Sequence, residues 1–150
     1  MKIAVLALLW SVLSAGRAES QILTPVHWSY GAKKLSATEA VVFFKATIDP
    51  GWHVYSQFVK PGGPVKTSFD FDGSSDFTLD GTTQEPKPTV RKEKVFSNME
   101  IGFFEHSVIF KQKIRLKTAQ AIVKGKLQYM TCNDTQCLPP DELDFSIAVK

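Results

Sequence analysis

Apolar and polar residues alternate in several short segments of this chain. Residues 68–72 and 108–116 repeat with a period of two, which is typical of strands that bury one face. Residues 41–48 are rich in β-branched and aromatic side chains, which also favours a strand. Further candidate strands are residues 52–58, 121–131 and 144–149.

Glycine and proline interrupt these segments. Asp49-Pro50-Gly51, residues 61–64 and residues 73–76 are turn signals. Residues 84–94 hold two prolines and four cationic side chains, and we expect a loop there. No segment after residue 18 has the pattern of an amphipathic helix of about ten residues or more. About seven short strands separated by turns predict an all-β fold, an immunoglobulin-like antiparallel β-sandwich.

The N-terminus has the pattern of a secretory signal peptide. Lys2 precedes the apolar residues 3–13, and Gly16-Arg17-Ala18 resembles a cleavage site with small residues. The apolar run is shorter than the 20 or so residues of a spanning helix, and a buried core helix is the less favoured alternative. We therefore predict a signal peptide at 1–18, one mature domain at 19–150, and export to the periplasm or beyond.

Removal of the signal peptide changes the charge of the chain. It takes away Lys2 and Arg17, which leaves 16 basic residues against 15 acidic ones. A mature chain so close to neutral gives no indication of a nucleic acid or an anionic membrane as a partner. No second hydrophobic segment follows, so we expect no membrane span in the mature chain.

The two cysteines are Cys132 and Cys137. Thiols in an exported protein are expected to oxidise, and turn-forming residues separate these two. Opposite residues of antiparallel strands lie about 4.5–5.5 Å apart at Cα, within the range of about 4.4–6.8 Å that a disulfide accepts. The spacing therefore permits a disulfide at the base of a tight loop.

Such a bond has two possible roles. Closing a six-residue loop contributes only about 2 kcal/mol, against roughly 4 for a bridge spanning half a domain, so its value as a staple is small. An exposed bridge of this kind is also easier to reduce. However, most disulfides of exported proteins are structural, and the gap is not the two-residue gap of thioredoxin-like motifs. The spacing alone leaves open a redox module and a binding module with a structural disulfide.

Two segments resemble a known family. Residues 129–140, Tyr-Met-Thr-Cys-Asn-Asp-Thr-Gln-Cys-Leu-Pro-Pro, followed by residues 144–147, are similar to the C-terminal motif of the N-terminal domain of DsbD, the transmembrane thiol:disulfide interchange protein. Residues 49–57 resemble a strand of the same family. The resemblance implies a periplasmic immunoglobulin-like module with oxidoreductase activity of the protein-disulfide reductase type. Such a module takes electrons from a thioredoxin-like domain or membrane thiol carrier and passes them to exported oxidised proteins, for example in cytochrome c biogenesis, without ATP, metal or organic cofactor.

The resemblance also implies roles for individual residues. Cys137 is expected to form mixed disulfides with partners, and Cys132 is expected to resolve them. Tyr55 and His53 are expected beside the cysteines. Phe96 is the candidate for an aromatic residue that caps the bridge from a flexible loop.

The chain departs from the family pattern at two points. Lys94 and Val95 stand where acidic residues are expected just before the cap, which questions any proton-handling role of that loop. The family protein continues into membrane helices and a thioredoxin-like domain, whereas this chain ends at Lys150, and we expect a free-standing module. The segment Leu138-Pro139-Pro140 has two interpretations, an apolar edge for partner docking or a strand boundary, since proline cannot donate to a sheet ladder.

Other candidate chemistry is weak. His27, His53 and His106 are scattered, and oxidised cysteines would not bind a metal with them, so we expect no metal site. Met99 and Met130 suit copper(I) in principle, but isolated methionines usually fill gaps in packing. The run 91–94 is interpreted as a solvated loop, because Glu93 interrupts its positive charge. A metal carrier is the third hypothesis after the redox and binding modules.

Overall fold

The computed structural model describes residues 21–150, and their regular secondary structure is almost entirely antiparallel β-sheet. The predicted signal peptide at 1–18 lies outside the described residues. The first sheet has the order β1-β2-β8-β5, and the second has the order β11-β9-β4. Their strands are β1 (Val26–Lys34), β2 (Glu39–Ile48), β8 (Ser107–Leu116), β5 (Phe77–Gln84), β11 (Asp141–Val149), β9 (Ala121–Tyr129) and β4 (Ser68–Phe71).

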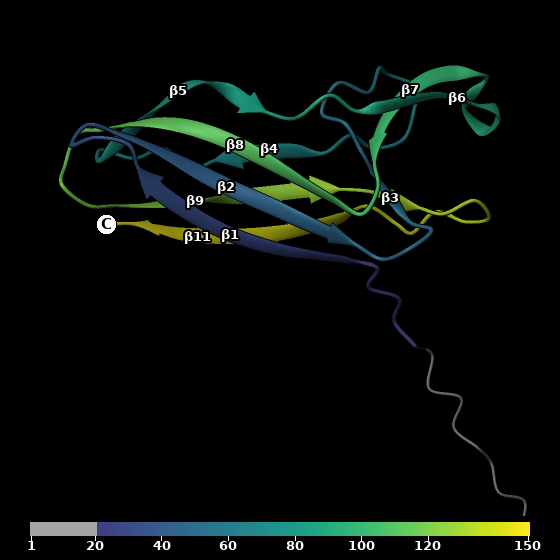
Figure 1. Cartoon of the computed structure of the whole chain (residues 1–150), viewed down its shortest axis with the longest axis horizontal. Helices are drawn as coiled ribbons and strands as arrows, with labels where there is room; N and C mark the ends of the chain where they lie inside the picture. The colour runs from purple at the N-terminus through teal and green to yellow at the C-terminus, as the bar shows by residue number, and fades with distance from the viewer. Residues whose placement is uncertain (1–20) are drawn as a thin grey trace, which may run out of the picture.

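These two sheets face each other and enclose the main core (Figure 1). Alternate residues of β2, β8, β9 and β11 are buried, as the period of two predicts. Phe44 of β2 lies at the centre, with its ring centroid 4.6 Å from that of Phe69 and 4.8 Å from that of Phe145. The predicted all-β, immunoglobulin-like sandwich is confirmed.

One glycine shows how closely the second sheet packs. A Cβ atom on Gly125 of β9 would lie 2.1 Å from the backbone oxygen of Asp70 and 2.6 Å from Cζ of Phe145. No larger residue fits there without moving β4. Close approach of these strands therefore requires glycine at this position.

A third, smaller sheet extends from one end of the sandwich (Figure 1). Its order is β10-β3-β7-β6, with β10 (Thr131–Cys132), β3 (His53–Tyr55), β7 (Met99–Phe104) and β6 (Thr89–Glu93). A single 3₁₀ turn, η1 (Lys94–Phe96), connects β6 to β7. Only Met130 separates β9 from β10, so the chain passes from the second sheet into the third with hardly a break.

The structure corrects two sequence-based expectations. The predicted loop at 84–94 contains β6, which pairs with β7 from Thr89↔Phe103 to Glu93↔Met99. The prolines occupy only the approach to this strand, and β6 has a neighbour on one side only. The predicted strand at 52–58 is shorter, because only His53–Tyr55 is paired. Within residues 21–150, no helix is long and apolar enough to cross a membrane.

Candidate redox site

Cys132 and Cys137 form a disulfide at the end of the chain segment that leaves β9. The two residues pair as an isolated antiparallel bridge, with their Cα atoms 4.0 Å apart. Asn133 organises the loop between them: its N–H donates to the Gln136 carbonyl at 2.9 Å, and its side-chain Oδ1 accepts from the N–H groups of Thr135 and Gln136 at 2.9 and 2.8 Å. The predicted tight loop with both cysteines at its base is confirmed.

The two sulfur-bearing residues differ in exposure. Cys132 is 1% exposed and belongs to a small cluster with Tyr55, Ile101 and Phe103. Cys137 lies on the exposed side of the loop. Cys137 is therefore the more accessible of the two residues, while Cys132 is covered by protein.

His53 and Tyr55 form the inner wall beside Cys132. His53 of β3 is the cross-strand partner of Cys132 of β10. Its Nε2 lies 3.1 Å from the Tyr55 hydroxyl, and both residues are 2% exposed. Thr131 fixes this arrangement, because its hydroxyl donates to the His53 carbonyl at 2.8 Å.

Burial keeps both of these groups neutral. Loss of hydration lowers the pKa of His53 below its usual value, and the Arg91 charge lowers it further, against smaller opposing effects of nearby carboxylates. Burial also raises the pKa of Tyr55 to about 12, and Glu93 adds to this rise. At neutral pH the wall therefore presents an uncharged imidazole and a protonated phenol.

Phe96 lies in η1, directly over this cluster. Its ring is partly buried and packs against the cluster that contains Cys132. Ser97 and Asn98 follow with φ of 55° and 58°, so the chain reverses sharply and returns to β7. The neighbouring Val95 lines the same cleft but is 85% exposed. Phe96 therefore lines the same cleft as both cysteines and packs against the cluster that holds Cys132.

Arg91 and Glu93 also belong to the site, although the run 91–94 was interpreted as a solvated loop. Both lie on one face of β6, half-buried, and Arg91 Nε donates to Glu93 Oε1. The Arg91 guanidinium carbon lies 4.3 Å from the centre of the Phe103 ring. A carboxylate therefore does lie before the cap, one residue earlier than Lys94. The spacing of two residues between Arg91 and Glu93 is the sequence signal that both side chains lie on one face of a strand. The prolines at 86 and 88 favoured a loop instead, so the strand was not predicted.

Five of the predicted site residues share one cleft of about 310 Å³. They are Cys132, Cys137, His53, Tyr55 and Phe96. Leu138, Pro139 and Pro140 do not line this cleft. They line a separate groove on the other side of residues 131–138, the segment that carries the disulfide and that we call the cysteine ribbon.

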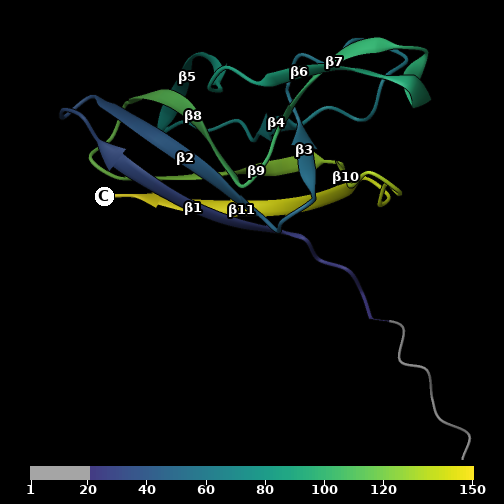
Figure 2. The ribbon, with the colours of Figure 1, turned by 45° about the vertical axis from the view of Figure 1, so that its right-hand side comes forward.

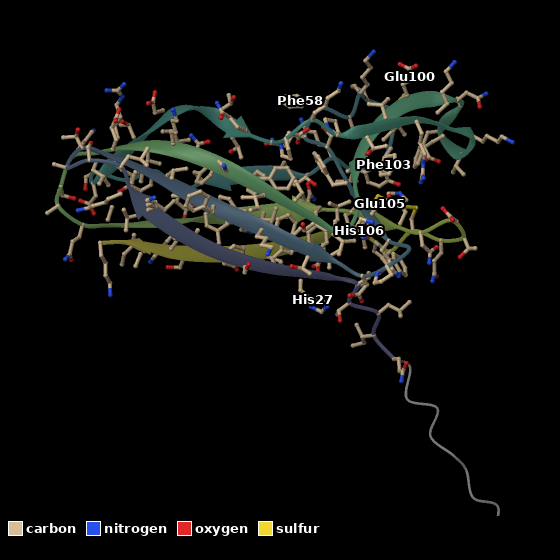
Figure 3. The ribbon with its side chains drawn as sticks, in the orientation of Figure 1. His27, Phe58, Glu100, Phe103, Glu105 and His106 are labelled. Atoms are coloured by element: carbon tan, nitrogen blue, oxygen red, sulfur yellow. A yellow bond between two sulfur atoms is a disulfide. The ribbon has the colours of Figure 1, made fainter. Side chains whose placement is uncertain are left out.

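The described part of the chain has no cluster of three or more His, Cys, Asp or Glu side chains suited to a metal. His27 lies near the start of β1, 3.7 Å from an Asp49 oxygen, and His106 lies in the β7–β8 connection (Figure 3). Neither joins His53 in the cleft lining. The histidines remain scattered in the fold, as they are in the sequence.

Comparison with known proteins identifies relatives of this arrangement. The sequence model of the family "Thiol:disulfide interchange protein DsbD, N-terminal" matches residues 20–148. Among curated proteins, none matches the sequence.

Three solved structures share the fold. The DsbD N-terminal domain of Neisseria meningitidis in the reduced form is 17% identical with a TM-score of 0.52, over 80% of this chain and 84% of that one. The N-terminal periplasmic domain of ScsB from Proteus mirabilis is 18% identical with a TM-score of 0.59, over 85% of this chain and 49% of that one. The complex between the DsbD and PilB N-terminal domains of Neisseria meningitidis gives 15% identity and a TM-score of 0.54, over 84% and 87% of the two chains.

Proposed function

This chain belongs to the family of DsbD N-terminal domains, and on that premise we propose that it relays electrons by thiol–disulfide exchange through the Cys132–Cys137 pair. One observation carries the proposal: the bridge joins an exposed sulfur-bearing residue to one that is 1% exposed, at the tip of a short loop. A structural staple has no need of an accessible end, whereas an exchange reaction does.

The exchange proceeds in two substitution steps. A partner thiolate attacks Sγ of Cys137, a new intermolecular S–S bond forms, and Cys132 leaves as a thiolate that takes up a proton. The second thiolate of the partner then attacks the partner's own sulfur in the mixed disulfide, which releases Cys137 as a thiolate. Two electrons have moved from the partner dithiol, which becomes a disulfide, to the cysteine pair. The reverse sequence on an oxidised target returns the pair to the disulfide.

The neighbouring residues support this division of roles. Neutral His53 and Tyr55 line the cleft beside Cys132, where the leaving thiolate develops. Glu93 and Asp134 are carboxylates of the same cleft lining and can exchange the proton that the thiolate needs. Phe96 lines the cleft beside the bridge, and we assign it the role of a cap that limits access of small thiols and oxidants to the bridge until a partner docks.

The proposed setting is the periplasm or another exported location. The electron donor is a thioredoxin-like domain or a membrane thiol carrier, and the acceptors are exported oxidised proteins, including those of cytochrome c biogenesis. The N-terminal pattern at 1–18 supports export. The relative solved in complex with the PilB N-terminal domain supports a folded protein as partner. The exchange needs no metal or organic cofactor.

Trapping of the mixed disulfide tests the assigned roles. In Cys132→Ala, the remaining thiol at Cys137 is activated with an aromatic disulfide and mixed with a thioredoxin that retains only its attacking cysteine. We expect a stable mixed disulfide that forms at least about tenfold faster than in the matched Cys137→Ala variant, where the single thiol is buried. Equal rates for the two variants would contradict the roles proposed for the cysteines.

A further inference from the structure

A second hollow lies on the opposite side of the cysteine ribbon from the capped cleft. It has a volume of about 720 Å³ and runs between the start of β1 and the start of β11. Figures 1 and 2 show these two strands side by side, both beginning at the end of the sandwich where the disulfide loop lies. We call it the β1–β11 groove.

The walls of the β1–β11 groove are apolar and aromatic. Trp28, Tyr30 and Tyr129 line it, and the Trp28 and Tyr129 rings lie 5.4 Å apart at their centroids. Leu23 lines its rim and is 49% exposed. The carboxylate of Asp141 is already engaged by the Tyr129 hydroxyl at 3.3 Å and by the Glu142 N–H at 2.9 Å. The groove therefore suits an uncharged, apolar occupant.

The cysteine ribbon is the common wall of the groove and the redox cleft. Thr131 and Leu138 line the groove, while the adjacent Cys132 and Cys137 line the cleft. The Leu138 N–H donates to the Thr131 carbonyl at 2.9 Å, which ties the two sides of the ribbon together. A partner protein whose sulfur attacks Cys137 is therefore next to the groove, because the adjacent residue Leu138 lines it.

The two strands that flank the groove are edge strands with unpaired backbone groups. Within residues 21–150, β1 pairs only with β2 and β11 pairs only with β9, so each turns an unpaired edge toward the other. The indole N–H of Trp28 is buried and has no hydrogen-bond partner. Unpaired sheet edges recruit extended chains, with backbone hydrogen bonds supplying affinity and side-chain pockets supplying specificity.

We propose that the β1–β11 groove binds an extended, apolar segment of the redox partner, next to the partner's reactive cysteine. The proposal rests on the proposed exchange function and adds a docking subsite to it. The volume lies within the range of about 300–1,000 Å³ that is typical of ligand-binding pockets. Docking there places the partner sulfur against the exposed Cys137 and leaves the capped cleft free for the departing Cys132.

Stopped-flow reduction of the oxidised mature protein tests this subsite. The probes are reduced thioredoxin, which is a folded partner, and dithiothreitol, which has no peptide segment to dock in the groove. The variants are Leu23→Asp, which puts a charge at the rim, and Tyr30→Ser, which removes an aromatic wall. The matched control is Ile122→Asp, since Ile122 is 55% exposed and lies at the other end of β9 from the cysteine ribbon. We expect each groove variant to lower the rate constant with thioredoxin at least fivefold and the rate constant with dithiothreitol by less than twofold, while the control changes neither.

Five results would overturn the docking subsite. Unchanged thioredoxin rates in both groove variants, or equal losses with both reductants, would show that the groove is not used by the partner. A rise in the rate for Leu23→Asp would identify the chain's own segment 21–24 as the occupant. A wild-type dimer that Leu23→Asp dissociates in sedimentation would identify a second copy. A wild-type protein that thioredoxin does not reduce at all would overturn the exchange function together with the subsite, which distinguishes the two failures.

Discussion

The aromatic residue above the cysteine pair offers a direct perturbation of the site. Replacing Phe96 by Ala removes the ring that packs on the cluster of Cys132 and Tyr55, while η1 and the returning β7 remain. Because Phe96 lines the cleft that holds both cysteines, the replacement is expected to widen access to the bridge. We therefore expect faster reduction by a small thiol.

The size of the effect follows from burial. Complete burial of a phenylalanine side chain contributes about 1.5–3 kcal/mol. Phe96 is only partly buried, so its packing favours the covered state by about 1 kcal/mol. Since about 1.4 kcal/mol corresponds to a factor of ten, the open state is disfavoured roughly fivefold, and Phe96→Ala should speed reduction by about that factor.

The assay is the second-order rate constant for reduction by dithiothreitol, followed by alkylation of free thiols and mass spectrometry. Val90→Ala is the matched control, because Val90 lies in the neighbouring β6, is 57% exposed and does not line the cleft. We expect the control to reduce at the wild-type rate. A Phe96→Ala protein that also reduces at the wild-type rate would refute the covering role of the ring.

Two further predictions concern stability. The lowered pKa of His53 means that the unfolded chain binds a proton more readily than the native state as pH falls through about 6.5, so native stability should fall from pH 7 to pH 5. Urea unfolding at the two pH values should show a smaller loss of unfolding free energy for His53→Gln than for the wild type. An identical loss in both proteins would show that His53 does not cause the pH dependence. Gly125→Ala should cost about 3 kcal/mol, because its Cβ would overlap the β4 backbone, whereas Gly73→Ala, with nothing within 4 Å, should change stability by less than about 1 kcal/mol. Equal unfolding midpoints for these two glycine variants would contradict the close packing of β4 on β9.

The strands of the sandwich could be predicted from the sequence where one face of the strand is buried and the other is exposed to solvent. Residues 108–116 alternate over most of their length, and β8 buries every second residue over the same range, including the polar Gln112. The segment 121–131 was recognised as one strand, whereas the structure divides it at Met130 between two sheets. The period-two pattern shows that one face of a strand is buried, but it does not show which strand lies beside it or in which sheet.

The cysteine pair and its loop were also predictable, since their geometry is local in sequence. The cleft around them was less so. Arg91 and Glu93 join the site only because β6 pairs with β7, a contact that charge and proline content concealed. The β1–β11 groove forms where two strands more than 100 residues apart in the sequence lie side by side. A local sequence pattern cannot predict such a contact.

The reduction potential of the Cys132–Cys137 pair tests the central claim most directly. The oxidised mature protein is equilibrated with glutathione or dithiothreitol buffers, and free thiols are quantified by alkylation and mass spectrometry. An exchange module should have a potential in the range of known exchange proteins, about −120 to −270 mV. A value well below about −300 mV would mark the bond as a structural staple and contradict the proposed electron relay.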